Sequence, residues 1–372
     1  MSASVILRSI TLRNFRNYKN ETLTFHDRFN LISGDNAQGK TNLLEAIHLL
    51  CTFRPFKQVK MEELISFGEA EGRIKGEIDA DSGLNEVHVI LTRNGKTIKL
   101  NGKIAYNTSR IASRFSVVSF LPLDLELIKG TPQVRRTYVD LLVSNFDPNH
   151  VKDLKSYFRA VTQRNALLMR KEQSVEALEV WDEKIGELGG RIVKRRINFI
   201  QKLEPEVEKI YAFVSGLKQE VKILYKPSFK LEGNFEEELK KELISKYRID
   251  KIRGHTSVGP HRDLIVFTIN GKDASSFASQ GEAKTLALSL KASEIKLIRN
   301  ILRRNPVLLL DDVASELDQN RRNFLFRLLQ EFSGQVFVTS TSPQELPNND
   351  HRRIFQIKAG RAQVIPPASP RT

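Results

Sequence analysis

The sequence predicts an α/β fold, in which a domain built on a mixed sheet is interrupted by an inserted helical arm. Three observations predict it: strand-like segments in both terminal parts, helical periodicity in the middle, and a glycine-rich loop between an apolar strand and a helix. We expect residues 1–122 plus 253–372 to form the first domain and residues 123–252 to form the arm.

The N-terminal part alternates apolar and polar residues from Val5 to Phe25, which favours antiparallel strands. The apolar run 29–32 predicts a buried strand, and residues 41–52 predict a helix because their leucines recur at helical spacing. Strands return over 72–104, where Asn94-Gly95 and Asn101-Gly102 are typical of two-residue hairpin turns.

The middle part, residues 123–252, is predicted to be mostly helical because its apolar residues recur at spacings of three and four. It holds 25 Lys and Arg against 21 Asp and Glu, a net charge of only +4. Its local basic cluster, Arg191–Arg196, is either a solvated helix face or a nucleic-acid contact.

The C-terminal part predicts strands over 264–269, 307–310 and 335–339, with a hairpin turn at Asn270-Gly271. Helices are expected after Ser279-Gln280-Gly281 and over 320–332. The last dozen residues contain three prolines, and we expect them to form a frayed tail.

The composition excludes several classes of protein. With 40% apolar and 28% charged residues, the 372-residue chain is neither collagen-like, nor wholly disordered, nor a coiled-coil rod. Its single cysteine, Cys51, excludes an internal disulfide and a zinc site built on a cysteine pair. No run of 18 apolar residues occurs and the N-terminal segment is charged, so we expect a cytoplasmic protein without a membrane partner.

The charge is strongly basic, with a net +15 at pH 7. Most of it, +11, lies in the segments that flank the predicted arm, where 34 Lys and Arg face 23 Asp and Glu. Such an excess indicates either a polyanionic partner such as DNA or a well-solvated basic surface.

The glycine-rich loop fits the pattern G-x-x-x-x-G-K-[ST] with a strand before it and a helix after it. Its residues are Gly34, Asp35, Asn36, Ala37, Gln38, Gly39, Lys40 and Thr41. The glycines let backbone N–H groups turn inward around phosphate oxygens, and the helix N-terminus adds its dipole. Lys40 is expected to reach the β- and γ-phosphates of ATP, and Thr41 to be a Mg²⁺ ligand.

The apolar run 307–310 ends in Asp311-Asp312. These two residues supply the carboxylates that a nucleotide site needs in addition to the phosphate-binding loop. Ligands bind at the carboxyl edge of parallel strands, so Asp311 is expected to hold Mg²⁺ together with Thr41. Asp312 is expected to act as the catalytic base that polarises the attacking water, with Lys40 as the second catalytic residue.

The segment Ser279-Gln280-Gly281 at a helix start is either a well-capped N-terminus or a phosphate-binding site. It resembles the signature motif of ABC-type ATPases, whose usual form is Leu-Ser-Gly-Gly-Gln. After Asp312, residues 313–318 resemble the D-loop of the same class.

Further segments narrow the resemblance to the RecF family of bacterial recombination-mediator ATPases. They fall in order along nearly the whole chain, at residues 12–18, 34–42, 128–136, 259–263, 278–281 and 309–318. The resemblance implies an ABC-type ATPase head with a mixed sheet, and a helical arm in place of a long coiled coil.

The resemblance also implies the activity. RecF-like proteins dimerise on ATP, with the phosphate loop of one copy facing the signature loop of the other. They act with RecO and RecR where single- and double-stranded DNA meet, and help load recombinase there. The resemblance therefore implies a DNA-stimulated ATPase of recombinational repair, with Ser279, Gln280 and Gly281 contacting the partner copy's nucleotide.

Two departures from the transporter pattern bear on turnover. Asp312 stands where transporters carry glutamate, one methylene longer, so we expect slow hydrolysis. Ser340-Thr341 stands where a histidine often senses the γ-phosphate. The turn 259–263 is either structural, with an Arg262–Asp263 pair, or it places Arg262 in support of the dimer interface or of the signature loop.

Two other functions stay open. A transport ATPase subunit would need a membrane partner, which the net charge and the helical arm disfavour. A scaffold whose nucleotide is structural and hydrolysed negligibly is the stronger alternative.

Overall fold

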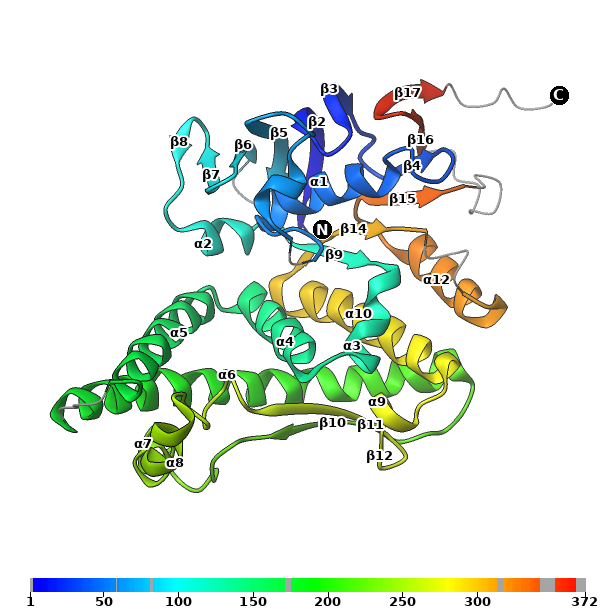
Figure 1. The fold of residues 1–372 in the computed structure, drawn as a ribbon. Helices are drawn as coiled ribbons and strands as arrows, with labels where there is room; N and C mark the ends of the chain where they lie inside the picture. The colour runs from blue at the N-terminus through cyan, green and yellow to red at the C-terminus, as the bar shows by residue number, and fades with distance from the viewer. Residues whose placement is uncertain are drawn as a thin grey trace. The chain divides into compact units, whose positions relative to one another are not determined.

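The computed structural model describes residues 3–57, 59–80, 83–170, 175–312, 317–341 and 352–365. Contacts divide the chain into two compact units, Met1–Asp124 with Lys291–Thr372, and Leu125–Leu290. Figure 1 traces both units from the blue N-terminus to the red C-terminus.

The first unit contains two six-stranded sheets. The antiparallel sheet has the order β3-β2-β5-β6-β7-β8, with strands Tyr18–Thr24, Ile6–Phe15, Glu71–Ala80, Gly83–Thr92, Gly95–Leu100 and Lys103–Ile104. The mixed sheet has the order β17-β16-β4-β15-β14-β9, with strands Arg361–Ile365, Arg352–Lys358, Phe29–Ser33, Val336–Ser340, Val307–Leu310 and Val117–Phe120. In it only β17 runs antiparallel to its neighbour. The mixed sheet agrees with the predicted fold class.

Helix α1 (Lys40–Thr52) joins the two sheets into one core (Figure 1). Its leucines and Ile47 pack in the same apolar cluster as Leu12 and Ile74 of the antiparallel sheet and Leu309 of the mixed sheet. Cys51 on this helix is fully buried, and burial raises the pKa of its thiol to about 12, as expected of a small apolar residue. The first unit also holds α2 (Thr108–Ala112), α12 (Gln319–Glu331), the short helices Met61–Leu64 and Pro122–Leu125, and the strand pair Ala3–Ser4 with Arg304–Asn305.

Two of the three predicted hairpin turns are confirmed. The third lies one residue earlier than predicted, because Thr92 pairs with Gly95 and the turn is therefore Arg93-Asn94 rather than Asn94-Gly95. At Asn101-Gly102 and at Asn270-Gly271 both turn residues have positive φ, 49° and 79° in the first and 50° and 75° in the second. A two-residue turn of this kind matches the twist of the strands it joins, and Asn-Gly adopts it with little strain.

The second unit is mainly helical but includes a small sheet. Its helices are α3 (Glu126–Lys129), α4 (Pro132–Phe146), α5 (Asn149–Leu168), α6 (Val175–Ser215), α7 (Phe235–Ser245), α8 (Tyr247–Arg253), α9 (Ala274–Phe277) and the first part of α10 (Gln280–Leu302). Its sheet has the order β10-β11-β12, with strands Val221–Lys226, Leu264–Ile269 and Lys272–Asp273. The prediction that residues 123–252 are mostly helical is confirmed, and strand β10 is an element that the sequence did not predict.

The predicted boundary between residues 252 and 253 differs from the division by contacts, because strand β10 of the arm pairs with a strand that lies beyond this boundary. Residues 253–290 belong by their contacts to the helical unit, whereas the sequence places them with the flanking segments. Strand β11 pairs with β10 along its whole length, from Val221 opposite Ile269 to Lys226 opposite Leu264. Because of this pairing, residues 253–290 make their contacts mainly with the arm.

The predicted tail is also partly wrong. Strand β17 covers Arg361–Ile365 and pairs with β16 in register from Ile354 opposite Ile365 to Lys358 opposite Arg361. A turn at Ala359-Gly360, where both residues have positive φ, returns the chain into the sheet. Residues 366–372 lie outside the described residues.

The basic cluster 191–196 is largely neutralised within the arm. Arg191 and Arg195 both bind Asp153, and Arg195 also binds Asp147 at 2.7 Å. Arg196 is 1% exposed and donates two hydrogen bonds of 2.8 Å to Asp140. These contacts favour a structural role for the cluster over the alternative of a nucleic-acid contact.

Arg164 on α5 is the centre of a second buried network, and it allows a stability prediction. Fully buried, it binds Asp182 at 2.6 Å and Asp250 at 2.7 Å. We expect Arg164→Met to lower the free energy of unfolding by about 3–5 kcal/mol, because both carboxylates would stay buried without their cation. Urea unfolding measures this. Arg159→Met, at an exposed position of the same helix, is the control and should have little effect.

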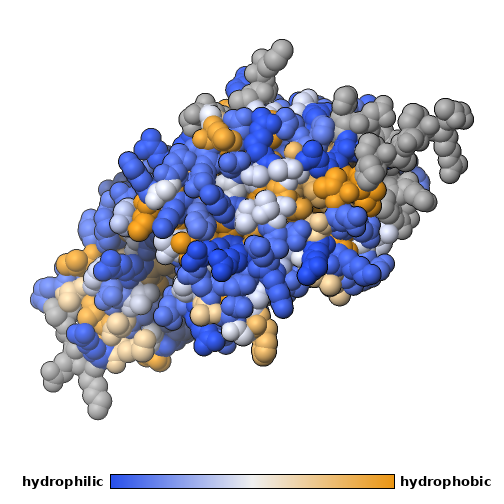
Figure 2. Space-filling view, turned by 90° about the horizontal axis from the view of Figure 1, so that it is seen from above, coloured by the Kyte–Doolittle hydropathy of each residue, from blue (hydrophilic) through white to orange (hydrophobic). Residues whose placement is uncertain are grey.

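The surface carries no extended apolar region on the face shown in Figure 2, where hydrophilic residues predominate and hydrophobic ones stand in small groups. Among the described residues, none of the helices combines the length and the apolar character that crossing a membrane requires.

Candidate functional site

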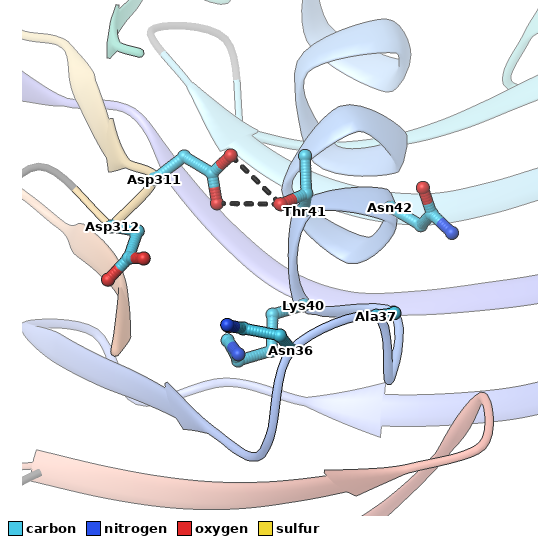
Figure 3. Close-up of a pocket in the computed structure, with 8 residues that line it drawn as sticks. Asn36, Ala37, Lys40, Thr41, Asn42, Asp311 and Asp312 are labelled. Carbon is cyan, nitrogen blue, oxygen red and sulfur yellow. Dashed lines mark hydrogen bonds between the residues drawn. The ribbon is translucent and has the colours of Figure 1, made fainter. Parts of the chain in front are cut away.

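The predicted phosphate loop lies at the C-terminal end of β4 and opens into α1. Together with the two aspartates that follow β14, it forms an open hollow of about 150 Å³ (Figure 3). The hollow is lined by Asn36, Ala37, Gly39, Lys40, Thr41, Asn42, Asp311 and Asp312. The structure thus brings together two segments that are 270 residues apart in the chain.

The backbone angles at Gly34 and Gly39, and the atoms that surround them, favour glycine at both positions. Their φ angles are 147° and 117°, which other residues rarely adopt. A Cβ at Gly34 would lie 2.5 Å from the carbonyl oxygen of Ile357, and one at Gly39 would lie 2.6 Å from Nδ2 of Asn17. The backbone of Ile357 cannot make room for a Cβ at Gly34, whereas the Asn17 side chain could move away from one at Gly39, so at Gly39 it is mainly the positive φ that favours glycine.

Asn17, in the turn between β2 and β3, supports the loop from outside. Its Nδ2 donates to the carbonyl oxygen of Gln38 at 2.9 Å, and its Oδ1 accepts from Asn42 at 2.9 Å. The neighbouring Tyr18 donates its hydroxyl to the carbonyl oxygen of Gly39 at 3.0 Å. The sequence analysis missed these contacts, because nothing in the spacing of residues 12–18 says which loop the turn will meet.

The turn between β16 and β17 supports the same loop. The amide of Gly360 donates to the carbonyl oxygen of Gln38 at 3.1 Å, and that of Ala359 to its side-chain Oε1 at 2.8 Å. A Cβ at Gly360 would lie 2.2 Å from the carbonyl oxygen of Asn17. The two turns and the loop are therefore packed backbone to backbone.

We expect Asn17→Ala to weaken nucleotide binding by about fivefold, because two hydrogen bonds that fix the loop are lost. Titration with a fluorescent ATP analogue measures the change. Asn20→Ala, at an exposed position of β3, is the matched control and should bind like the wild type. Equal affinities for the Asn17 and Asn20 variants would contradict the supporting role.

Lys40 folds back over its own loop. Its ammonium donates to the carbonyl oxygens of Gly34 at 2.6 Å and Asp35 at 2.8 Å, and the residue is only 7% exposed. Phosphate oxygens are better partners for an ammonium than neutral carbonyl oxygens. This arrangement therefore holds the cation ready for the phosphates of a nucleotide.

Thr41 and Asp311 face each other across the hollow (Figure 3). The Thr41 hydroxyl lies 3.0 and 2.9 Å from the two carboxylate oxygens of Asp311. Burial raises the pKa of Asp311, while hydrogen bonds from Thr339 and Thr41 act in the opposite direction. A hydroxyl and a carboxylate are ligands that Mg²⁺ takes in proteins, alongside waters and substrate phosphates. The pair therefore fits Mg²⁺, which would neutralise phosphate charge there.

No group of three or more His, Cys, Asp or Glu side chains with the arrangement of a metal site occurs among the residues that the structure describes.

Asp312 lines the hollow and has an unusual backbone. Its φ is 48°, in the left-handed region, and its amide donates to Oγ1 of Thr339 at 2.8 Å. Aspartate tolerates this conformation better than most residues. The Asp312 side chain points in a direction different from that of the buried Asp311 (Figure 3).

The segment Ser279–Gly281 lies in the second unit, at the N-terminus of α10, and forms a capping box. The amide and the hydroxyl of Ser279 lie 2.8 and 2.9 Å from Oε2 of Glu282, whose own amide donates back to the Ser279 hydroxyl at 3.2 Å. These bonds lower the pKa of Glu282. Ser279 and Gln280 are both exposed. The well-capped helix is thus present, and the exposed residues remain candidates for a phosphate contact.

Lys129 supports the segment that precedes Ser279. Its ammonium donates to the carbonyl oxygens of Ala274, Ser275 and Ala278 at the end of α9. A lysine at a helix C-terminus satisfies carbonyl groups that have no partner within the helix.

The turn 259–263 is held by hydrogen bonds to β10 and to the residues that follow it. Fully buried, Asp263 accepts hydrogen bonds from Tyr225 and from the amide and hydroxyl of Ser228, not from Arg262. His261 binds the hydroxyl of Tyr157 at 2.7 Å, and Arg262 is exposed. The expected Arg262–Asp263 pair is therefore replaced by contacts to β10 and the residues that follow it.

The remaining predicted residues are only partly described. Ser340 is buried at the end of β15, opposite Ser33, and Thr341 is exposed. Residues 313–316 of the D-loop-like segment lie outside the described residues, whereas Asp318 caps α12 by accepting from the amide of Arg321 at 3.1 Å.

Comparisons with known proteins agree with this arrangement. Residues 6–365 match the model of the family described as RecF/RecN/SMC N terminal domain. The DNA replication and repair protein RecF of Geotalea uraniireducens is 36% identical over 361 residues, which are 95% of this chain and 99% of the relative. That of Streptococcus gordonii is 37% identical over 360 residues, with the same coverage of each chain.

Solved structures give the same result. The structure described as the recombination mediator protein RecF-ATP in the RecFOR pathway is 36% identical, has a TM-score of 0.91, and covers 98% of this chain and 99% of its own. A Smc head domain from Pyrococcus furiosus, 17% identical, has a TM-score of 0.56 and covers 97% and 96% of the two chains. The second likeness concerns the fold alone, and the two likenesses together confirm the predicted fold class. By its family model, its relatives and its fold, the chain belongs to the RecF family.

Proposed function

We propose that the protein is an ATP-dependent DNA-binding protein of recombinational repair. The loop 34–41 would bind the phosphates of ATP, with Lys40 on the β- and γ-phosphates and with Thr41 and Asp311 on Mg²⁺. The observation that carries the proposal is the contact of Thr41 with both carboxylate oxygens of Asp311. This contact brings the phosphate-binding loop next to the end of strand β14, and a site for phosphate and Mg²⁺ needs both. The names of the relatives support the assignment to DNA repair.

The ATP-bound state would be a homodimer. Ser279, Gln280 and Gly281 of one copy would contact the γ-phosphate that the partner copy holds through Lys40. In this proposal residues 253–290 work with the ATPase head, as the predicted domain division has it. Hydrolysis removes the phosphate that bridges two chains, so nucleotide state becomes assembly state.

The dimer would bind DNA where single and double strands meet and would help to load recombinase there with RecO and RecR, in the cytoplasm. The net charge of +15 supports a polyanionic partner. Contacts by Lys and Arg to phosphates rather than to base edges would give little sequence preference.

Hydrolysis would be slow and stimulated by DNA, with Asp312 as base and Lys40 on the reacting phosphate. The short side chain of Asp312 keeps a second candidate function open, a nucleotide-dependent scaffold with negligible hydrolysis. Counting released phosphate over an hour, with and without DNA, separates the two functions.

One experiment tests the main proposal. DNA binding is titrated with ATP, with ADP and without nucleotide, while the oligomer size is followed in the same samples. We expect a dimer that binds DNA tightly with ATP, weak binding with ADP, and a steep loss of binding as salt rises. A monomer that binds DNA equally well in all three conditions would overturn the proposal.

A further inference from the structure

Thr339 is a buried threonine behind the hollow that no sequence motif singles out. It lies on β15, between β4 and β14, is 2% exposed, and pairs with Ile32 on the strand that leads into the phosphate loop. It is not among the residues that line the hollow. A threonine in the middle of a buried parallel sheet needs hydrogen-bond partners for its hydroxyl.

The Thr339 hydroxyl has two close partners, and they are the two neighbouring aspartates. It donates to Oδ1 of Asp311 at 2.8 Å and accepts the backbone amide of Asp312, also at 2.8 Å. A hydroxyl can serve both at once, because it has one proton to donate and lone pairs to accept. The carbonyl oxygen of Leu310 is a more distant third partner at 3.4 Å.

The two bonds act on different features of the site. The bond to Asp311 fixes the carboxylate that also accepts from Thr41, so it sets the direction of the proposed magnesium ligand. The bond from the Asp312 amide holds the backbone at a φ of 48°, and this turn determines where the Asp312 carboxylate points. One hydroxyl thus orients both acidic groups.

We propose that Thr339 is a positioning residue that locks the magnesium-binding carboxylate and the proposed catalytic base of Asp312 into one geometry. The role rests on the proposed ATP hydrolysis. Thr339 itself touches neither nucleotide nor water in this role. It acts through the two aspartates, whose placement to within about 1 Å affects the rate strongly.

Valine and serine separate this role from a packing role. Thr339→Val keeps the branched shape and the strand preference but has no hydroxyl, whereas Thr339→Ser keeps the hydroxyl and loses one methyl group. If only shape mattered, valine would be the better replacement. If the hydroxyl positions the aspartates, serine would be better.

The test uses the full chain and two readouts. We expect Thr339→Val to weaken ATP-analogue binding about tenfold in the presence of Mg²⁺ and not in EDTA, because a hydrogen bond to a charged group is lost. Single-turnover hydrolysis should fall about 100-fold. Thr339→Ser should restore both. Thr268→Val, at a buried position of β11, is the control for a strand threonine and should leave both unchanged.

Three outcomes would overturn the proposal: equal behaviour of the valine and serine variants, a loss of binding that is the same in EDTA, or wild-type behaviour of Thr339→Val. If the valine variant fails to fold, hydrogen exchange of the wild type decides. The Asp312 amide should be strongly protected, and fast exchange would overturn the proposal. A wild type that neither binds nor hydrolyses ATP contradicts the proposed function instead, so the two failures are distinguishable.

Discussion

Asp312→Asn is expected to slow single-turnover ATP hydrolysis by about 10²–10⁴-fold, the usual contribution of a general base. The amide is almost the same size as the carboxylate but cannot accept the proton of the attacking water. The backbone bond from the Asp312 amide to Thr339 does not involve the changed atoms. ATP binding and ATP-dependent dimerisation should therefore persist, and the variant should stay in the ATP-bound assembly for longer.

Quenched-flow measurement of hydrolysis, with sedimentation of the same samples, checks this expectation. Asp27→Asn is the matched control, because Asp27 forms a surface ion pair with Arg8 and lies outside the hollow. Its rate should equal that of the wild type. Equal rates for Asp312→Asn and wild type would remove Asp312 from the role of base and favour the scaffold function.

Ser279→Arg is expected to abolish the ATP-dependent dimer while the affinity of the monomer for ATP stays unchanged. Ser279 is exposed at the start of α10, and its hydroxyl and amide face a carboxylate oxygen of Glu282. In the proposed dimer a phosphate oxygen of the partner copy approaches this position, and a long arginine side chain would block it. Sedimentation against ATP concentration, with analogue binding measured below the dimer range, separates the two effects.

Ser279→Arg both removes the N-cap of α10 and adds bulk, and a second variant is needed to separate these two effects. Replacement of Ser279 by arginine loses the cap of α10, which costs about 1 kcal/mol of stability. Ser279→Ala loses the same cap without adding bulk. We expect the alanine variant to dimerise about tenfold more weakly and the arginine variant not at all. An intact dimer in Ser279→Arg would show that this surface is not the interface.

The phosphate and magnesium residues are predictable from the sequence because their chemistry is local. Gly34 and Gly39 are needed for backbone angles within one loop, and Asp311 follows an apolar run of the kind that is typical of a buried strand. Each signal lies within ten residues of the feature it predicts. The elements on either side, α1 and β14, begin and end within one residue of their predicted bounds.

The residues that support the site are not predictable in this way. Asn17 and Thr339 act through partners that are far away in the chain, and only the pairing of β15 with β14 brings Thr339 to Asp311. No spacing rule reports such a contact. The same reason explains the missed strands: β10 and β17 are stabilised by their neighbours β11 and β16, and their own sequences carry a weak alternation.

The support of the phosphate loop by the turn 359–360 has a consequence for folding of the chain as it is synthesised on the ribosome. Gly34 packs against Ile357, and Gln38 is held by the amides of Ala359 and Gly360. A nascent chain that has emerged only as far as α12 has its entire nucleotide motif but not the strands that brace it. Competence to bind nucleotide should therefore arise only after β16 and β17 have left the exit tunnel.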